Sequence, residues 1–342
     1  MSKEIMKAKI AVVLLALFTV VWITDCVNTK LVTPENSKIP YANIENIDVE
    51  NYYVKGKNQQ KFYKIPKHVV AVGDNVVETL MELGIQDNIV LAVAGNKWNF
   101  QFREENQRKF QTVPQGDYKN LNKETIVSLN PDLIIGQQMT FSKEYLGSTK
   151  YWNDRGVNTI VTLNANAPNL HVRPETIENE MKCISDYGKI FGKEDEAAEI
   201  NKEIIATIEK VKRNAIHYPK PKVMIIEFMR YFVSYDNTKL VGNMAERLGG
   251  YVEESPPVIT SEELLKIDPD VLFVVCSHSV FDHCYNRIYD DPAFNSLKCV
   301  KNHRIYGIPM KFTYSTLCRT NDGLKMLAKG MYPGIQGLDD EI

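Results

Sequence analysis

The feature of this sequence that most constrains its fold is an internal repeat. Residues 124–135 read Glu-Thr-Ile-Val-Ser-Leu-Asn-Pro-Asp-Leu-Ile-Ile, and residues 262–273 read Glu-Glu-Leu-Leu-Lys-Ile-Asp-Pro-Asp-Val-Leu-Phe. In both copies a short amphipathic helix stops before a proline, which disfavours helix at the residue before it. An aspartate then leads into an apolar run that suits a buried strand. The repeat predicts two units with related wiring.

Apolar runs and helical patterns alternate along both units, which predicts an α/β fold. The continuous apolar runs suit strands that are covered on both faces, as in parallel sheets. We therefore expect two lobes, each with a mainly parallel sheet flanked by helices. The predicted strands are residues 68–72, 89–93, 132–135 and 158–163 in the first lobe, and 222–228, 271–275 and 304–306 in the second.

Two helical stretches lie between the lobes, at residues 174–190 and 194–215, with Gly192 as a break. At about 1.5 Å per residue the second helix is about 33 Å long, which is enough to reach from one lobe to the other. We expect this one long helix to join the lobes. The expected division is an N-terminal lobe at residues 65–172, connecting helices at 173–217 and a C-terminal lobe at 218–342.

The amino terminus has the layout of an export signal. Lys3, Lys7 and Lys9 precede an apolar run at residues 10–23. This run is shorter than the roughly 20 residues that a helix needs to cross a bilayer. We expect a signal peptide at residues 1–25, with a retained signal anchor as the alternative, and a mature protein that works outside the cytoplasmic membrane.

The segment after the apolar run predicts a lipid anchor and a tether. Cys26 resembles the acylated cysteine of bacterial lipoproteins, although Asp25 stands where a small residue is expected. Residues 26–64 are polar and contain no sustained apolar period, which is typical of a tether. A small exposed hairpin at about residues 49–65, turning at 55–58, is an option within this tether.

Charge and motifs argue against nucleic acid as the main partner and against an enzyme. The 41 Lys and Arg residues nearly balance the 43 Asp and Glu residues, so no basic excess exists to neutralise a phosphate backbone. The sequence contains no GxxxxGK[ST], GxGxxG, HExxH or GxSxG pattern. We expect neither catalysis nor an intrinsic cofactor.

Seven segments, spread over both expected lobes and including most or all of each copy of the repeat, resemble the substrate-binding proteins of ABC importers for iron chelates, haem and vitamin B12. The two lobes of those proteins are joined by a single helix. The resemblance implies a monomer that binds a metal chelate in a cleft between the lobes and delivers it to a permease and its ATPase subunit. The bound ligand would be an iron-siderophore, haem or a corrinoid. The resembling segments are residues 65–72, 78–84, 122–135, 261–270, 291–298, 301–306 and 331–333.

The resemblance places the ligand among loops at the carboxyl ends of the strands, where open α/β sheets usually bind ligands. Aromatic side chains there offer flat surfaces for a conjugated or macrocyclic ligand, and basic side chains offer charge for its carboxylates. His278 or Tyr231 would be an axial ligand if the cargo is haem. Aromatic residues beside strands also pack in cores, so we expect about half of the set to be structural. The candidates are Trp98, Gln138, Arg230, Tyr231, Tyr235, His278, Lys311 and Tyr314.

Two carboxylates match the positions at which this family docks onto arginines of the permease. They are Glu124 and Glu262, which begin the two copies of the repeat. A glutamate in the first turn of a helix also complements the helix dipole, worth about 0.3–1 kcal/mol, without any partner. Their equivalent places in the two lobes favour docking, because paired exposed charges suit steering to a partner.

A cluster of sulfur and imidazole groups raises an alternative function. Cys276, His278, His283 and Cys284 follow a predicted strand. Their spacing matches no standard zinc pattern, so we expect no resident metal. The alternative is an extracytoplasmic metal-binding enzyme or chelatase-like protein that uses this loop. An adhesion lipoprotein is a third option, which the paired lobes disfavour.

Overall fold

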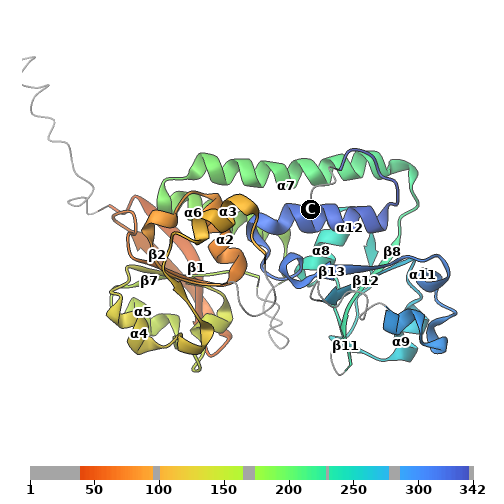
Figure 1. The fold of residues 1–342 in the computed structure, drawn as a ribbon, viewed down its shortest axis with the longest axis horizontal. Coiled ribbons are helices and arrows are strands. Elements are labelled where there is room, and N and C mark those ends of the chain that lie inside the picture. The colour runs from red at the N-terminus through yellow and green to blue at the C-terminus, as the bar shows by residue number, and fades with distance from the viewer. Residues whose placement is uncertain (1–38, 95–100, 165–173, 229–230, 277–285, 339–342) are drawn as a thin grey trace, which may run out of the picture. The chain divides into compact units, whose positions relative to one another are not determined.

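The computed structural model describes residues 39–94, 101–164, 174–228, 231–276 and 286–338. By their backbone contacts these residues form a small unit, made of residues 39–42 and 62–64, and a large unit that holds the rest. The large unit contains two mainly parallel sheets flanked by helices (Figure 1), which confirms the predicted α/β class. The expected signal peptide and Cys26 lie outside the described residues.

The N-terminal sheet has five strands, all parallel, in the order β5-β4-β3-β6-β7. Its central strand β3 is fully buried, as expected of an apolar run covered on both faces. The strands are β3 (Val69–Val72), β4 (Ile89–Val93), β5 (Gln115–Gly116), β6 (Leu133–Gly136) and β7 (Asn158–Val161). The helices of this part are α2 (Asp74–Glu82), α3 (Glu104–Phe110), α4 (Lys123–Ser128) and α5 (Thr149–Asn153).

The C-terminal sheet has the order β11-β9-β8-β12-β13, with β10 paired to the start of β8. Strands β8, β10, β12 and β13 are parallel, whereas β9 and β11 run antiparallel to their neighbours. The strands are β8 (Lys222–Phe228), β9 (Phe232–Ser234), β10 (Tyr251–Val252), β11 (Val258–Ile259), β12 (Val271–Cys276) and β13 (Ile305–Pro309). The helices are α8 (Leu240–Arg247), α9 (Ser261–Ile267), α11 (Lys298–Lys301) and α12 (Thr320–Met331).

Two helices connect the sheets in sequence, and the second is the long helix expected from its pattern. Helix α6 (Ile177–Phe191) ends at Gly192, whose φ of 65° is left-handed, and α7 (Glu194–Asn214) follows. Acidic residues in the first turn of α7 and basic residues in its last turn suit the helix dipole. Helix α7 packs against both α6 and α12 (Figure 1). No helix of the described residues is long and apolar enough to cross a membrane.

Both copies of the sequence repeat make the same kind of hydrogen bond through the aspartate that follows the proline. In the first copy, Asp132 Oδ1 accepts a hydrogen bond from the backbone N of His68, just before β3, at 3.0 Å. In the second copy, Asp270 Oδ2 accepts one from the backbone N of Lys222, at the start of β8, at 2.8 Å. Each aspartate therefore ties its own strand to the beginning of the neighbouring central strand.

The N-terminal hairpin differs from the sequence-based expectation. Strands β1 (Ala42–Glu50) and β2 (Tyr53–Phe62) are joined at Asn51 and Tyr52, which have φ of 50° and 72°, so the predicted turn at residues 55–58 is wrong. The Lys-Gly-Lys-Asn stretch favoured the wrong position because it has turn-forming residues, yet it lies within β2.

This hairpin is also less exposed than predicted. The Asn46 side chain accepts from Val161 N at 2.9 Å and donates to Val161 O at 3.1 Å, so it pairs like a strand with the edge strand β7. Inward-facing residues Ile44, Ile47 and Val49 of β1 are buried. Residues 43–61 of the hairpin are therefore part of the large unit, where they pack against β7.

Short 3-10 turns complete the described structure and carry several residues of interest. They are η2 (Gln86–Asn88), η3 (Tyr118–Asn120), η4 (Gln138–Phe141), η5 (Ala215–His217), η7 (Pro292–Phe294), η8 (Met310–Phe312) and η9 (Leu317–Arg319).

Candidate functional site

The strand order of the two sheets points to one edge of each as the place for a ligand. In the N-terminal sheet the chain adds strands to one side of β3 and then to the other, so strand order reverses between β3 and β6. In the C-terminal sheet β12 and β13 extend the sheet from β8 on the side opposite β9. Open α/β sheets bind ligands outside the carboxyl ends of strands at such positions. Asn75 and Gln138 follow β3 and β6, and Glu227 lies near the end of β8.

Three oxygen groups meet at the end of β8 in what we term the acid–phenol cluster, made of Glu227, Tyr235 and Tyr314. Glu227 Oε2 lies 2.5 Å from the Tyr235 hydroxyl and 2.7 Å from the Tyr314 hydroxyl, and the two hydroxyls are also in hydrogen-bonding contact with each other. The two phenol protons are shared among these three contacts. Tyr235 follows β9, which runs back along β8, and Tyr314 follows η8. The three groups come from separate segments that the sheet brings together.

The electrostatics of the acid–phenol cluster keep Tyr314 protonated. Burial, followed by the neighbouring Tyr235 and the Glu227 carboxylate, raises the pKa of Tyr314 far above its usual value. Tyr235 is only 2% exposed, whereas Tyr314 is half-buried. Tyr314 is therefore the phenol of the cluster that an incoming molecule can reach.

Asn75 links the start of helix α2 to the segment that carries Tyr314. Its side-chain Nδ2 donates to the backbone O of Lys311 at 3.0 Å and to that of Tyr314 at 3.3 Å. Its Oδ1 is buried and has no hydrogen-bond partner among the described residues. The same holds for Oε1 of Gln138 in η4. These two amides supply acceptors that are not used within the described protein.

Lys311 lies beside a set of charged groups that the sequence analysis did not single out. Its Nζ donates to the backbone O of Gln101 at 3.3 Å. Burial lowers the pKa of Lys311, and the nearby Arg319 guanidinium lowers it further, while Glu78 and Asp322 oppose this shift. Lys311 thus belongs to a partly buried charge network and is not an isolated surface cation.

The centre of that network is a buried ion pair between Glu78 on α2 and Arg319 on η9. Arg319 Nε lies 2.7 Å from Glu78 Oε2, and both side chains are almost fully buried. Asp322 extends the network by accepting from Arg319 at 2.8 Å and from Arg103 at 3.1 Å. The network holds helix α2 against the segment that follows Tyr314, so it supports the geometry of the acid–phenol cluster.

The other predicted ligand residues do not join the acid–phenol cluster in the described structure. Tyr231 is 53% exposed and no described residue bonds to its hydroxyl. Trp98, Arg230 and His278 lie outside the described residues. The structure therefore brings together Tyr235 and Tyr314, and it links Lys311 to Tyr314 through Asn75. Gln138 lies in η4, after β6, and takes no part in these hydrogen bonds.

Of the four residues in the cysteine–histidine cluster, only Cys276 lies within the described residues. Cys276 is 6% exposed, packs in the apolar core of the C-terminal sheet, and its Sγ donates to Val274 O at 3.7 Å. His278, His283 and Cys284 lie outside the described residues. Within the ranges that the structure describes, no group of three His, Cys, Asp or Glu side chains could hold a metal ion. Cys183, Cys299 and Cys318 are buried thiols.

The two predicted docking carboxylates are exposed at equivalent places. Glu124 lies in the first turn of α4 and Glu262 in the first turn of α9. The helix caps are made by other side chains, namely Asn122 in α4 and Thr260 with Glu263 in α9. Neither Glu124 nor Glu262 makes a hydrogen bond or ion pair with a described residue, so both carboxylates are available to a partner.

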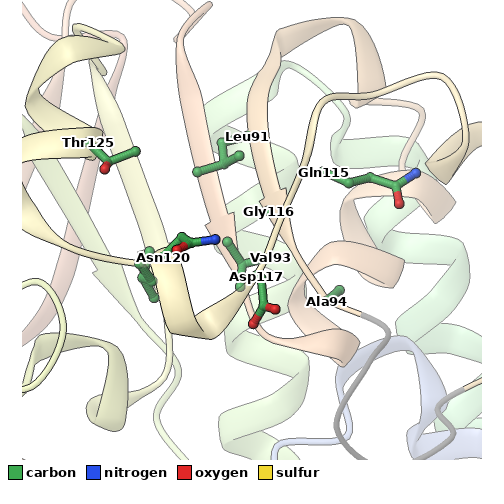
Figure 2. Close-up of a pocket in the computed structure, with 9 residues that line it drawn as sticks. Leu91, Val93, Ala94, Gln115, Gly116, Asp117, Asn120 and Thr125 are labelled. Carbon is green, nitrogen blue, oxygen red and sulfur yellow. The ribbon is translucent and has the colours of Figure 1, made fainter.

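A separate hollow of 460 Å³ opens at the edge of the N-terminal sheet, beside α4 (Figure 2). Its apolar side is formed by strand β4, and its polar side by the segment that leads into α4 (Figure 2). A Cβ at Gly116 would come within 3.0 Å of Leu91, so the glycine keeps this space open. The lining residues are Leu91, Val93, Ala94, Gln115, Gly116, Asp117, Asn120, Leu121 and Thr125. The hollow contains no member of the acid–phenol cluster.

Glu227 and Asn75 are the site residues that sequence reasoning missed. Glu227 is the one acidic residue in the apolar run of strand β8, and an acid near the end of a buried strand is a detectable signal. Asn75 has no such signal, because only its contacts with Lys311 and Tyr314 reveal its role.

The chain matches a known protein family. A family model described as periplasmic binding protein matches residues 69–311, so the chain belongs to the periplasmic binding protein family. This finding confirms the resemblance seen in the sequence.

Individual relatives agree with this assignment. The chain is 24% identical over 286 residues to YvrC of Bacillus subtilis (strain 168), named as an ABC transporter substrate-binding lipoprotein, with 79% of this chain and 81% of YvrC covered. It is similar to the crystal structure of a periplasmic binding protein from Veillonella parvula DSM 2008, with 25% identity, a TM-score of 0.78, and 88% and 95% of the two chains covered. A structure of an ABC-type Fe3+-hydroxamate transport system from Saccharomonospora viridis DSM 43017 shares the fold, at 20% identity, a TM-score of 0.63, and 84% and 99% coverage.

Proposed function

We propose that this protein is the extracytoplasmic substrate-binding component of an ABC importer that captures an iron-siderophore, haem or cobalamin-type ligand and delivers it to the permease and its ATPase subunit. Membership of the periplasmic binding protein family supports the receptor role. The similarity to YvrC supports the importer, and the fold shared with the Fe3+-hydroxamate system supports a metal chelate as cargo. Catalysis plays no part in this proposal.

The observation that carries the proposal is the acid–phenol cluster at the end of β8. Tyr314 presents a protonated phenol and an aromatic ring, Lys311 adds a positive charge, and the amides of Asn75 and Gln138 add unused acceptors. A polar chelate with an aromatic or macrocyclic body needs this combination of a flat apolar contact and a few directed polar groups. Trp98, Arg230, Tyr231 and His278 remain proposed ligand residues.

The proposal is tested by titrating the full chain in detergent with three probes, namely ferrioxamine B, haemin and cyanocobalamin. Tryptophan fluorescence and the absorbance band of each probe would report binding. We expect saturable one-to-one binding of one class of probe. The absence of binding by all three would contradict the proposed cargo.

Variants of the acid–phenol cluster then test its role. Tyr314→Phe and Glu227→Gln should each weaken binding of that probe about tenfold, because each removes a hydrogen bond from a partly buried polar group. Tyr251→Phe is the matched control, since Tyr251 is an exposed tyrosine on β10. Equal affinities for Tyr314→Phe and Tyr251→Phe would remove Tyr314 from the site.

Docking through Glu124 and Glu262 is a separate part of the proposal. The double variant Glu124→Ala with Glu262→Ala should bind ligand normally and transport it poorly, because both carboxylates are exposed and without a described partner. The control is Glu199→Ala with Glu209→Ala, which removes two exposed carboxylates from α7. Normal transport by the Glu124→Ala, Glu262→Ala variant would contradict a role for these two carboxylates in docking.

We also propose that a lipid on Cys26 holds the receptor at the outer face of the cytoplasmic membrane. The similarity to a lipoprotein supports this anchor. Metabolic labelling with a palmitate analogue should mark the wild-type chain and leave Cys26→Ser unlabelled. Release of the Cys26→Ser chain into the soluble fraction would separate a lipid anchor from a retained signal helix, which would keep that variant in the membrane.

A further inference from the structure

A carboxylate is buried at the point where helix α6 meets the segment that follows Tyr314. Glu180 is 1% exposed. Its Oε1 accepts from Asn164 Nδ2 at 2.6 Å, and its Oε2 accepts from the backbone N of Leu317. Glu180 therefore joins three separate parts of the chain, namely the end of β7, helix α6 and the turn η9.

The turn that Glu180 holds is strained. Ser315 and Leu317 have φ of 40° and 47°, which is the left-handed region that residues with a Cβ rarely adopt. Both are fully buried. Such conformations cost on the order of 1–3 kcal/mol each and persist only where the surroundings impose them. The strained turn comes directly after Tyr314, so its conformation sets where the Tyr314 phenol lies.

The chain beyond the turn is held independently by helix α2. The backbone N of Cys318 donates to Thr79 Oγ1 at 3.2 Å, and Arg319 pairs with the buried Glu78. Because these contacts fix the residues after the turn, the bond from Glu180 to Leu317 controls the short stretch between that anchor and Tyr314.

We propose that Glu180 is a positioning residue whose ionised carboxylate holds the turn at residues 315–317, and with it the Tyr314 phenol, and that loss of this charge releases the turn. For ligand capture the proposal rests on the proposed function, because it assumes that Tyr314 contacts the ligand. Release of the turn would then lower affinity, and it would couple binding to acidity.

The contacts of Glu180 show why its charge decides the state of the turn. Asn164 Nδ2 also donates to Thr176 O, and its Oδ1 accepts from Thr176 N, so this amide has no freedom to turn an acceptor toward Glu180. Both carboxylate oxygens thus face N–H donors, and the Thr316 hydroxyl also hydrogen-bonds to the carboxylate. A proton on Oε2 displaces the N–H of Leu317, and the strained turn loses the bond that opposes its relaxation.

Burial brings the titration of Glu180 into the physiological range. Burial raises its pKa to about 7, the hydrogen bonds from Leu317 and Asn164 oppose this shift, and the charge of Glu175 adds to it. The titratable groups that interact with it are Glu175, just before helix α6, and Cys183 and Tyr187 on α6. Turn η9 adds Cys318 and Arg319 directly after Leu317, and Arg319 is paired with Glu78.

Hydrogen exchange of the full chain without ligand tests the proposal. The protection factor of the Leu317 amide, which corrects for intrinsic exchange, should be about tenfold lower at pH 5.5 than at pH 8. Glu180→Gln should show low protection at both pH values. Its neutral amide replaces a carboxylate oxygen with an N–H donor, which would face the N–H donor of Asn164 or of Leu317. Glu178→Gln, an exposed change on the same helix, should behave like the wild type.

A second measurement follows Tyr314 itself and does not depend on a variant at Glu180. With tyrosine labelled at ¹³Cζ, the resonance that disappears in Tyr314→Phe should shift in the wild type with a midpoint near pH 7. A Tyr314 resonance and a Leu317 protection factor that do not change over this range would overturn the proposal. So would equal changes in Glu180→Gln, since the titrating group would then be another one. Neither measurement involves ligand, so failure here is distinct from failure of the proposed cargo.

Discussion

The N-terminal and C-terminal sheets begin in the same way and end differently. At their amino ends, Asp132 and Asp270 accept backbone hydrogen bonds that tie β6 to β3 and β12 to β8. At the carboxyl ends, the first sheet presents the amide of Gln138, whereas the second presents Glu227. The amino ends repeat because they serve folding, which both units need. Among the described residues, the carboxyl ends share no such contact, so their side chains are free to differ.

The largest expected effect comes from breaking the Glu78–Arg319 pair, which joins helix α2 to the turn η9. Glu78→Ala should lower the free energy of unfolding by about 3–5 kcal/mol, because it breaks a buried ion pair and leaves Arg319 with Asp322 as its remaining carboxylate partner among the described residues. Urea unfolding would measure this. Glu104→Ala, which removes an exposed pair with Arg108, should change stability by less than about 1 kcal/mol. Similar losses of stability in the two variants would show that the Glu78–Arg319 pair contributes little to the free energy of unfolding.

The second effect is a pH dependence that arises where helix α6 meets the C-terminal segment. The pKa of Glu180 is raised from 4.5 to about 7 in the folded protein. The folded chain therefore binds more protons than the unfolded chain between these values. Stability should fall as pH rises through this window, by about 3 kcal/mol. Urea unfolding from pH 4.5 to 8 should show this slope in the wild type, and Glu180→Gln should lack that contribution.

This global trend has the opposite sign to the local effect proposed for the turn. Protonation of Glu180 removes a buried charge and stabilises the whole chain, while it weakens the bond to Leu317. Higher global stability together with lower protection of Leu317 at acidic pH would be the signature of this carboxylate. Parallel changes in both quantities would contradict it.

The repeated aspartates sharpen the comparison between the sheets. The Asp132 carboxylate accepts hydrogen bonds from two backbone N–H groups, those of Lys67 at 2.9 Å and of His68 at 3.0 Å. Among the described residues, the Asp270 carboxylate accepts one, from the backbone N–H of Lys222. Asp132→Ala should therefore cost about 2–3 kcal/mol and Asp270→Ala about 1–1.5 kcal/mol. Denaturant unfolding of both variants gives the two values, and a larger loss for Asp270→Ala would mean that the two copies are not equivalent.

The smallest expected effect concerns the left-handed residue before each proline of the repeat. Asn130 and Asp268 have φ of 48° and 46°, so glycine would fit either position. Asn130→Gly should raise stability by about 0.5 kcal/mol, because its side chain makes no hydrogen bond among the described residues. Asp268→Gly should instead lose about 1 kcal/mol, since Asp268 Oδ1 accepts from Lys298 N at 2.9 Å. Changes of the same sign, measured by thermal unfolding, would contradict this difference.

Much of the fold was predictable from the sequence because its signals are local. The apolar runs placed β3, β4, β6, β7, β8, β12 and β13 within a few residues of their observed bounds, and the Glu- and Lys-rich pattern placed α7. The short strands β5, β9, β10 and β11 were missed, because two or three residues carry no measurable periodicity. The turn of the first hairpin was misplaced because Asn51 and Tyr52 adopt the turn while Gly56 lies in a strand.

The site was predictable only in part. Tyr235 and Tyr314 were proposed because aromatic residues after apolar strands are visible in the sequence, and Lys311 was proposed for its charge; that they bind ligand stays a prediction. Nothing in the sequence paired Tyr314 with Glu227, which lies 87 positions earlier in the chain. Such a contact depends on the order of the strands, which periodicity does not report.

The sequence by itself determined the class of the fold, the two related units and the helix between them, since periodicity, the Pro-Asp pairs and the helix ends act over a few residues. The tertiary structure decided which polar groups meet. Glu180 and Leu317 are 137 positions apart, and Glu78 and Arg319 are 241 positions apart, yet each pair is in contact and buried. The reason is physical, because a buried charge is tolerated only where the packed chain supplies its partner, and that partner is chosen by the fold.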